Sequence, residues 1–267
     1  MIFAGIDIGS TTTETVFTDE NGKLIAKAQV LSGFDMEAAS EAALSECCKI
    51  AGVNREDIKY CIGTGYGREL IKGADEQYTE IACHARGAHY CFPEVRGVID
   101  IGGQDSKAIA VTERGGILDF GMNDKCAAGT GRFLEVMAGI MGISVGEMGQ
   151  LSLKAEKEVK VSSICTVFAE SEVISLLSKK EVSPYDIMGG IHSSVVRRVN
   201  MLVQKARLQP PIAMTGGVAK NVGVVAAFEK LLNTKILIPE DPQCIGALGA
   251  SIIACERYMK KAEKAKQ

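Results

Sequence analysis

The sequence predicts an α/β protein made of two homologous halves, and two observations point to this fold class. The segment GIDIGS at residues 5–10 recurs as VIDIGG at residues 98–103, so an apolar strand that ends in an Asp-Ile-Gly turn occurs twice. Each copy continues into strand-like segments joined by a glycine turn, and amphipathic helical segments follow. With 46% hydrophobic and 24% charged residues, the chain has the composition of a folded protein.

Each half is expected to begin with three antiparallel strands. Asp7 and Asp100 are separated by an offset of 93 residues, and the hairpin glycines Gly22 and Gly115 are separated by the same offset. The matching offsets mean that the first strand, the turn and the next two strands are repeated as one unit. This repeat predicts a strand meander at the start of both halves.

A second repeated feature predicts an insertion in the second half. Thr64 and Thr215, each followed by glycine, match at an offset of 151 residues, which exceeds the first offset by 58. An insertion of about that size therefore lies between roughly 122 and 208. We expect a first half at 1–93 and a second half at 94–267, with a helical insertion at about 123–207.

The remaining segments have helical periodicity. Pro184 suits the first turn of a helix, where its missing N–H costs no hydrogen bond. Helices are expected at 36–50, 79–91, 132–141, 167–178, 184–206, 220–232 and 245–261.

Composition excludes several function classes. A net charge of −3 does not suit a nucleic-acid binder, which usually carries a basic excess. No apolar run approaches the length of a membrane span, and residues 1–9 lack a basic export signal, so a cytoplasmic protein is expected. The nine cysteines are odd in number and form no CxxC pair, which disfavours a disulfide framework or a zinc knuckle.

Two turns have the character of phosphate-binding loops. Residues 7–13 (DIGSTTT) and 100–105 (DIGGQD) end a strand with a glycine turn and then offer hydroxyl and amide groups. Either copy alone is equally well interpreted as a polar hairpin turn, but two copies can hold one polyphosphate from opposite sides. Asp7 and Asp100 lie at strand ends, where carboxylates can hold Mg²⁺ through its waters. The chain has no GxxxxGK[ST] segment and is therefore not a P-loop enzyme.

A third loop, MTGGVAKN at 214–221, leads from a strand through paired glycines to a helix start. Paired glycines let a flat group or a phosphate approach the backbone, although an ordinary strand-to-helix turn has the same pattern. The GTGYG segment at 63–67 is only a weak dinucleotide-binding signal.

Together, the internal duplication, the two Asp-Ile-Gly loops and the Thr-Gly-Gly-Val loop resemble the acetate kinase, sugar kinase, Hsp70 and actin superfamily. This resemblance implies an actin/Hsp70-like ATPase fold of two RNase H-like domains, with ATP and Mg²⁺ in a cleft between them. The phosphate loops then include Gly9, Ser10, Thr11 and Thr12 in the first half and Gly102 and Gly103 in the second. Adenosine is lined by Gly216, Gly217, Lys220 and Asn221. Gln104 and Asp105 follow the second loop and are the candidates for positioning the attacking water.

Two of the cysteines precede predicted helices. Cys126 lies in a small-residue loop before the helix at 132–141, and Cys165 directly precedes the helix at 167–178. A helix N-terminus favours a thiolate and any anionic cluster bound there. Two thiolates are half of the usual four ligands of an iron–sulfur cluster, and a twofold dimer would supply four. On this chemistry alone, two buried thiols are an equally good interpretation.

The segments NDKCAAGTGRF at 123–133 and CTVFAESEV at 165–173, with IDIGGQD and MTGGVA, resemble the activator component of (R)-2-hydroxyacyl-CoA dehydratases. The ATPase subunits of benzoyl-CoA reductase are close relatives of that component. The resemblance implies an oxygen-sensitive homodimer, typical of anaerobic amino-acid fermentation, with one [4Fe-4S] cluster held by Cys126 and Cys165 of both protomers. It also implies an ATP or ADP site in each protomer. ATP hydrolysis would drive single electrons to a dehydratase, and a ferredoxin or flavodoxin would supply them.

Three alternatives stay open at this point. One is a sugar or small-acid phosphotransferase, with Asp124 as general base to a hydroxyl; otherwise Asn123 and Asp124 are structural neighbours of Cys126. Another is a nucleotide switch without redox chemistry, and the third is a benzoyl-CoA-reductase-type ATPase subunit.

The other cysteines and the histidines are interpreted mainly as packing residues. A helix places Cys83 and His84 on different faces, which disfavours a metal cluster, although the role of this pair stays open. The residues concerned are Cys47, Cys48, Cys61, Cys83, His84, His89, Cys91, Cys244 and Cys255.

Overall fold

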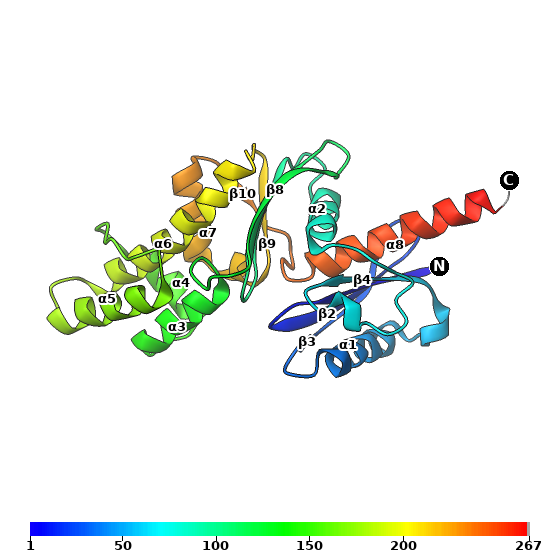
Figure 1. Cartoon of the computed structure of the whole chain (residues 1–267), viewed down its shortest axis with the longest axis horizontal. Helices are drawn as coiled ribbons and strands as arrows, with labels where there is room; N and C mark the ends of the chain where they lie inside the picture. The colour runs from blue at the N-terminus through cyan, green and yellow to red at the C-terminus, as the bar shows by residue number, and fades with distance from the viewer. Residues whose placement is uncertain (266–267) are drawn as a thin grey trace. The chain divides into compact units, whose positions relative to one another are not determined.

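The computed structural model describes residues 1–265, which form two compact units (Figure 1). The first unit comprises Met1–Pro93, Thr112–Ile117 and the chain from Gln243 onward, and the second comprises Glu94–Val111 and Leu118–Pro242. The expected halves, 1–93 and 94–267, differ from this division at the end of the chain, because the last helix packs with the first unit.

The sheet of the first unit begins with the expected antiparallel meander. Strands β1 (Ile2–Ile8), β2 (Thr12–Thr18) and β3 (Leu24–Leu31) pair in order, and β4 (Ile58–Gly65) lies parallel to β1 on its other side. The short strand β5 (Glu76–Gln77) completes the order β3-β2-β1-β4-β5. The unit also contains the helices α1 (Met36–Ala51) and α2 (Glu80–Cys91) and the 3-10 turns Arg55–Asp57 and Arg68–Leu70.

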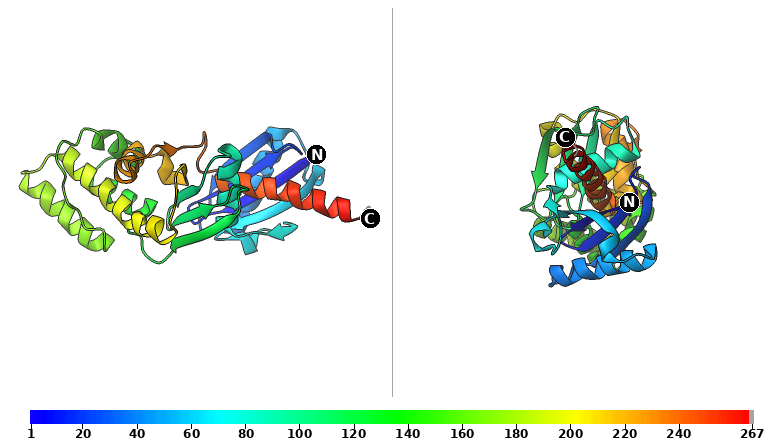
Figure 2. Two further views of the ribbon diagram at one scale, coloured as in Figure 1. Left: turned by 90° about the horizontal axis from the view of Figure 1, so that it is seen from above. Right: turned by 90° about the vertical axis from the view of Figure 1, so that its right-hand side faces the viewer.

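The last helix, α8 (Ile245–Lys264), packs against β1 and α2 because glycines allow direct backbone contact. A Cβ on Gly5 would overlap the carbonyl oxygen of Ala247, and one on Gly249 would overlap that of Cys83. Ser251 of α8 donates a hydrogen bond to the Phe3 carbonyl at 2.9 Å. The views in Figure 2 show this helix, in red, beside the blue strands of the same unit. Sequence periodicity identified the helix but gave no sign of which sheet it covers.

The sheet of the second unit repeats the topology of the first. Strand β6 (Gly97–Ile101) pairs antiparallel with β7 (Ser106–Val111) and parallel with β9 (Ile212–Thr215). With β8 (Ile117–Asn123) and β10 (Ile236–Leu237), the order is β10-β9-β6-β7-β8. Asp7 stands opposite Thr64 in the first sheet, and Asp100 stands opposite Thr215 in the second. Asp7 therefore corresponds to Asp100, and Thr64 corresponds to Thr215, which confirms both offsets predicted from the sequence.

Helices fill the predicted insertion. Between β8 and β9 the chain forms α3 (Gly131–Met141), α4 (Val145–Ser152), α5 (Thr166–Lys179) and α6 (Pro184–Lys205). The first unit has α1 at the corresponding place. The sequence analysis missed α4, although its capping box, Ser144 with Glu147, is a recognisable start signal. After β9, the 3-10 turn Gly217–Lys220 precedes α7 (Val222–Leu232), which starts later than predicted because Asn221 caps it.

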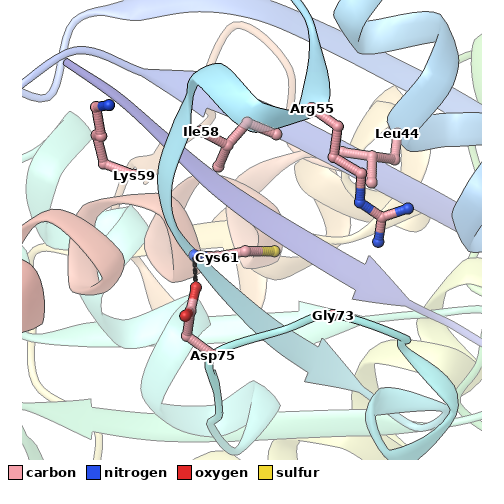
Figure 3. A pocket seen from close by; sticks show the side chains of 7 residues that line it. All are labelled: Leu44, Arg55, Ile58, Lys59, Cys61, Gly73 and Asp75. Atoms are coloured by element: carbon pink, nitrogen blue, oxygen red, sulfur yellow. Dashed lines mark hydrogen bonds between the residues drawn. The ribbon is translucent and has the colours of Figure 1, made fainter.

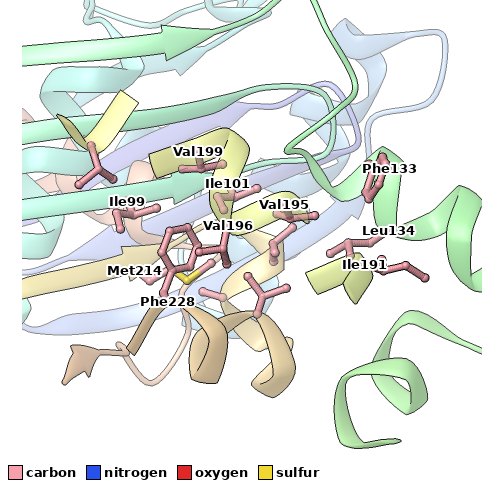
Figure 4. Close-up of a cluster of buried hydrophobic side chains, with 14 of the residues drawn as sticks. Ile99, Ile101, Phe133, Leu134, Ile191, Val195, Val196, Val199, Met214 and Phe228 are labelled. Carbon is pink, nitrogen blue, oxygen red and sulfur yellow. The ribbon is translucent and has the colours of Figure 1, made fainter. Parts of the chain in front are cut away.

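The core of the second unit lies between its sheet and α6. Val195 and Val199 of α6, fully buried, pack with Ile99 and Ile101 of β6 and with Phe228 of α7 (Figure 4). The same cluster extends to Phe133 and Leu134 of α3, so the insertion shares the core of its sheet. Among the described residues, no helix combines the length and apolar character needed to cross a bilayer.

A pair of glycine substitutions tests the contact between α2 and α8. Gly249→Ala forces a methyl group into the Cys83 carbonyl, so we expect a loss of about 3 kcal/mol in the free energy of unfolding. Gly139 of α3 has nothing within 4 Å of an added Cβ, and Gly139→Ala should gain up to about 1 kcal/mol from helix propensity. Urea unfolding measures both values, and an unchanged midpoint for Gly249→Ala would contradict the backbone contact.

Candidate functional site

The two Asp-Ile-Gly turns have the same backbone hydrogen bond. Gly9 N donates to Thr12 O at 3.0 Å after β1, and Gly102 N donates to Asp105 O at 3.1 Å after β6. A Cβ on Gly9 would lie 2.8 Å from Thr12 O, and one on Gly102 would lie 2.7 Å from Asp105 Oδ1. Both turns therefore need glycine, and both leave a backbone surface without a side chain, as phosphate binding requires.

Asp7 lies at the end of β1, against the start of α8. Its side chain is almost buried, and a Cβ on Gly246, in the first turn of α8, would overlap its Oδ2 atom. His84 Nε2 of α2 lies 3.9 Å from the same oxygen. The positive end of the helix dipole favours a carboxylate at this position.

Asp100, the counterpart of Asp7, has different neighbours. Its Oδ1 accepts a hydrogen bond from Thr215 Oγ1 at 2.9 Å, and its Oδ2 accepts one from Lys107 Nζ at 3.2 Å. Lys107 is only 2% exposed and also donates to Asp105 Oδ2 at 2.7 Å. Both oxygens of Asp100 thus accept hydrogen bonds, which fix the orientation of this carboxylate.

Gln104 and Asp105 lie side by side in the second turn but differ in environment. Gln104 is exposed, whereas Asp105 is partly buried and paired with Lys107. Asp105 therefore fixes the lysine, and Gln104 is the freer of the two to reach a water molecule.

The third loop lies against the end of β6. Gly216, at a φ of 81°, has no room for a Cβ, which would overlap Ile101 O and lie 2.9 Å from Asp100 Oδ1. Val218 and Ala219 are buried, and Lys220 pairs with Asp241 at 3.5 Å. The second and third loops of this unit therefore meet, as an ATP site requires.

Asn221 has a structural role that the sequence analysis did not assign to it. Its Oδ1 caps α7 by accepting from Gly223 N and Val224 N at 3.0 and 3.1 Å, and its Nδ2 donates to Val145 O at 3.1 Å. The side chain thus joins α7 to α4 through both its oxygen and its nitrogen.

Cys126 lies in a short loop between β8 and α3 and is half-buried. Asn123 Nδ2 donates to Cys126 O at 2.9 Å, which confirms the prediction that Asn123 is its structural neighbour. Thr130, fully buried, donates from Oγ1 to Ala127 O at 2.7 Å and closes the loop before the helix. Asp124, the base of the kinase alternative, is exposed.

Cys165 precedes α5, as the sequence predicted, and the structure makes it the N-cap residue of that helix; its side chain is also half-buried. The preceding loop is fixed by Glu172 of α5, whose Oε2 accepts from Ser162 N at 2.8 Å. Three apolar side chains beside the thiol are strongly exposed. They are Ile164, Val167 and Phe168, at 73%, 64% and 67%.

Both cysteine loops rest on one stretch of α6, the α6 base, defined as Ser194, Arg197 and Arg198. Ser194 Oγ donates to Ser162 O at 2.8 Å, and Arg197 Nη2 donates to Val161 O at 2.9 Å, which fixes the Cys165 loop. A Cβ on Gly129, in the Cys126 loop, would lie 2.8 Å from Arg198 Cγ. One helix thus supports the two loops that carry the candidate ligands.

The thiols suit an iron–sulfur cluster only as half of a ligand set. Among residues 1–265, no three His, Cys, Asp or Glu side chains gather as a metal site. Thiolates are the ligands that such clusters take, usually four in number, and the two loops of one chain present two.

The remaining cysteines confirm the packing interpretation in most cases. Cys47, Cys61, Cys83, Cys244 and Cys255 are buried, while Cys48 and Cys91 are half-buried. Burial raises the pKa of Cys47, Cys61 and Cys83 to about 12, which makes these thiols poor nucleophiles. His89 Nε2 lies 3.0 Å from Glu113 O in the same unit.

A cavity of about 260 Å³ lies elsewhere in the first unit, between Leu44, Arg55, Cys61 and Asp75 (Figure 3). Two of its polar side chains have partners: Asp75 accepts from Cys61 N at 2.8 Å, and Arg55 donates to Lys72 O at 2.8 Å. None of the predicted site residues lines it, so it adds nothing to the candidate site.

Sequence reasoning missed Lys107 and the α6 base. A lysine within the otherwise apolar strand SKAIAV was a visible signal, because a buried lysine requires an anionic partner. The α6 base had no such signal, since serine and arginine on a long helix are typical of a solvated face.

Comparisons with known proteins agree with this geometry. Residues 4–254 match the model of the BadF/BadG/BcrA/BcrD ATPase family. The 2-hydroxyisocaproyl-CoA dehydratase activator of Clostridioides difficile is 45% identical over 266 residues, which cover 100% of this chain and 99% of that protein. The (R)-2-hydroxyglutaryl-CoA dehydratase activating ATPase of Acidaminococcus fermentans is 45% identical over 257 residues, 96% of this chain and 98% of that protein.

A solved structure supports the same conclusion. The activator of the 2-hydroxyisocaproyl-CoA dehydratase from Clostridium difficile, with bound ADPNP, superposes with a TM-score of 0.92 at 44% identity, covering 99% of this chain and 98% of that one. The predicted resemblance to the dehydratase activators and the actin/Hsp70-like fold are both confirmed. Sequence, topology and the duplicated turns lead to one conclusion: the chain is a member of the BadF/BadG/BcrA/BcrD ATPase family.

Proposed function

We propose that this chain is an ATP-dependent one-electron donor that activates a 2-hydroxyacyl-CoA dehydratase. The observation that carries the proposal is the pair of half-buried thiols, Cys126 and Cys165, held by the same α6 base at the starts of two helices. Relatives named as activators of such dehydratases align with nearly the whole chain, which supports the choice of partner.

ATP binding is assigned to the repeated turns. Gly9 and Gly102, whose amides close the turns, leave space for a phosphate without a side chain. The hydroxyls of Ser10, Thr11 and Thr12 and the amide of Gly103 donate hydrogen bonds to it. The backbone of Gly216, Gly217 and Lys220 borders adenosine. Asp7, beside the start of α8, holds Mg²⁺ through its waters, while Lys107 and Thr215 keep Asp100 in place.

Cys126 and Cys165 are the residues that would hold a [4Fe-4S] cluster. Two copies of the chain, related by a twofold axis, supply the four thiolates that one copy lacks. The exposed side chains of Ile164, Val167 and Phe168 beside Cys165 offer an apolar surface for that contact. When bound, the cluster supplies a one-electron carrier.

Hydrolysis is the reaction of ATP and water to ADP and phosphate. Gln104, exposed in the second turn, positions the water, and Asp105 keeps Lys107 beside Asp100. For each electron that the partner dehydratase gains, the activator loses one, which a ferredoxin or flavodoxin then restores. Binding energy drives this transfer only if the two nucleotide states differ in their contacts with the protein.

The nucleotide assignment predicts the effect of Gly103→Val. Two added methyl groups crowd the approach of a phosphate to the turn, so ATP affinity should fall about tenfold or more while bound iron is retained. Gly146→Val is the control, because nothing lies within 4 Å of a Cβ there. Titration calorimetry with ATP measures the difference, and equal affinities for the two variants would refute the phosphate assignment.

The cluster assignment predicts an iron-poor protein for Cys126→Ser and for Cys165→Ser. Each substitution removes two of four thiolates, because the dimer doubles every change. Anaerobically purified parent protein should be brown, with about four irons per dimer. Cys48→Ser, at another half-buried thiol, should keep its iron. A colourless, iron-free parent would instead favour a phosphotransferase or a nucleotide switch.

The coupling predicts that the partner is reduced only with hydrolysable ATP. Reduced activator, mixed anaerobically with a 2-hydroxyacyl-CoA dehydratase, should transfer electrons with ATP and not with ADP or a non-hydrolysable analogue. Stopped-flow absorbance of the activator measures the transfer. Equal rates without nucleotide would leave a simple electron carrier in place of an ATP-driven donor.

A further inference from the structure

The second phosphate turn is hydrogen-bonded to the first turn of α3. Gly131 N donates to Gly102 O at 2.9 Å, and Arg132 N donates to Gly103 O at 2.8 Å. The first amides of a helix have no partner within the helix. The carbonyls of the phosphate turn therefore cap α3, and the two elements are joined through backbone atoms alone.

This junction is closely packed. A Cβ on Gly131 would lie 3.1 Å from Gly102 O, 3.4 Å from the Gly103 Cα atom and 3.4 Å from a methyl group of Val218. Val218 belongs to the third loop, so both nucleotide-binding loops of this unit meet at the start of α3. A shift of the Gly102–Gly103 turn reaches the helix through backbone atoms, and a shift of the third loop reaches it through the Val218 side chain.

The connection continues from α3 to Cys126 over a few residues. Thr130, fully buried, closes this segment with two bonds to Ala127 O, from its backbone N at 3.0 Å and its Oγ1 at 2.7 Å. Asn123 Nδ2 then holds Cys126 O at 2.9 Å. The loop is thus stiff, and a movement at Gly131 is carried to the thiol.

Because each peptide bond is planar, the N–H groups on one side of the turn and the carbonyls on its other side rotate together. Gly102 C=O and Gly103 N–H belong to one rigid plane and point in opposite directions, as do Gly103 C=O and Gln104 N–H. A phosphate that accepts from these amides fixes the carbonyls toward α3. Release of the phosphate frees the planes to rotate, which weakens the bonds to Gly131 and Arg132.

We propose that these two backbone bonds relay the nucleotide state from the Gly102–Gly103 turn to the Cys126 loop, with the amide of Arg132 as a positioning group. The relay rests on the function proposed above and adds the atoms that connect its two sites. It lies wholly within the second unit.

The pair Arg132→Pro and Arg132→Ala isolates one bond. Proline removes the N–H that reaches Gly103 O and places its ring Cδ there, so the bond is lost and the carbonyl is displaced; the helix itself loses no bond, because that N–H has no partner within it. Alanine keeps the N–H and loses the same exposed side chain, including its ion pair with Glu135. Comparing the two variants therefore cancels the effect of the side chain.

The main measurement is the rate at which an iron chelator removes iron from the full-length anaerobic protein with ADP or with a non-hydrolysable ATP analogue. The ratio of the two rates should differ from one in Arg132→Ala. In Arg132→Pro the ratio should lie about fivefold closer to one than in Arg132→Ala, because the loss of one backbone hydrogen bond changes an equilibrium by about that factor. Iron content and ATP affinity should match in both variants.

A second measurement is independent of the cluster. In iron-free protein, iodoacetamide labelling of Cys126, followed by peptide mass spectrometry, should depend on the nucleotide in Arg132→Ala and lose that dependence in Arg132→Pro. Labelling of Cys165 is the internal reference, because its loop is bonded to α5 and α6. It should be the same in the two variants.

The outcomes separate the relay from the function on which it rests. Equal nucleotide dependence in both variants would overturn the relay alone, and so would loss of iron or ATP affinity in Arg132→Pro, since the bond would then only hold the loops together. Absence of iron in Arg132→Ala would overturn the proposed function and the relay with it.

A second pair decides the matter if Arg132→Pro does not fold. Gly131→Ala presses a methyl group against Gly102 O, whereas Gly139→Ala adds the same group to α3 in open space. Loss of the nucleotide dependence in Gly131→Ala, with retention in Gly139→Ala, supports the relay. Equal behaviour of the two variants overturns it.

Discussion

Each unit is organised around the close approach of a glycine to a strand-end aspartate. Gly65 ends β4 at a φ of 88°, and a Cβ there would overlap Asp7 Oδ1. Gly216 follows β9 at a φ of 81°, and a Cβ there would lie 2.9 Å from Asp100 Oδ1. Only glycine adopts this conformation freely and leaves room for the carboxylate. In each unit, this contact holds the end of the parallel strand (β4 or β9) beside the turn that follows the first strand (β1 or β6). In the second unit this brings the Gly102–Gly103 turn and the loop that begins at Gly216 together.

The same contact has acquired different surroundings in the two copies. Asp7 lies at the start of α8 with His84 nearby, so a helix dipole stabilises its charge. Asp100 instead pairs with a buried lysine, because Lys107 stands opposite it in the antiparallel register where the first copy has Glu14 opposite Asp7. One copy thus has a carboxylate beside a helix start. The other holds a carboxylate and an ammonium group that fix each other.

The helical insertion extends the second unit without separating from its core. Helix α6 packs Val195 and Val199 against the sheet, and the α6 base supports both cysteine loops. The start of α3 is in turn capped by the phosphate turn. A buried core helix therefore supports both cysteine loops, and the loop of Cys126 is also joined to the Gly102–Gly103 turn by a few backbone hydrogen bonds. Such an arrangement suits a protein in which a small change at a phosphate alters the environment of a thiol.

The sequence by itself determined the duplication, its offsets, most helices and the position of Cys126 and Cys165 ahead of two helices. These features are local or repetitive: a strand that must end in a glycine turn, or a cysteine that must precede a helix, is encoded by adjacent residues. The tertiary structure alone decided which sheet α8 covers, how Asn221 is used, and that Lys107 pairs with Asp100. It also decided that Gly131 and Arg132 meet the phosphate turn. These contacts join residues distant along the chain, often through backbone atoms, and backbone hydrogen bonds between distant segments leave no residue-specific pattern in a sequence.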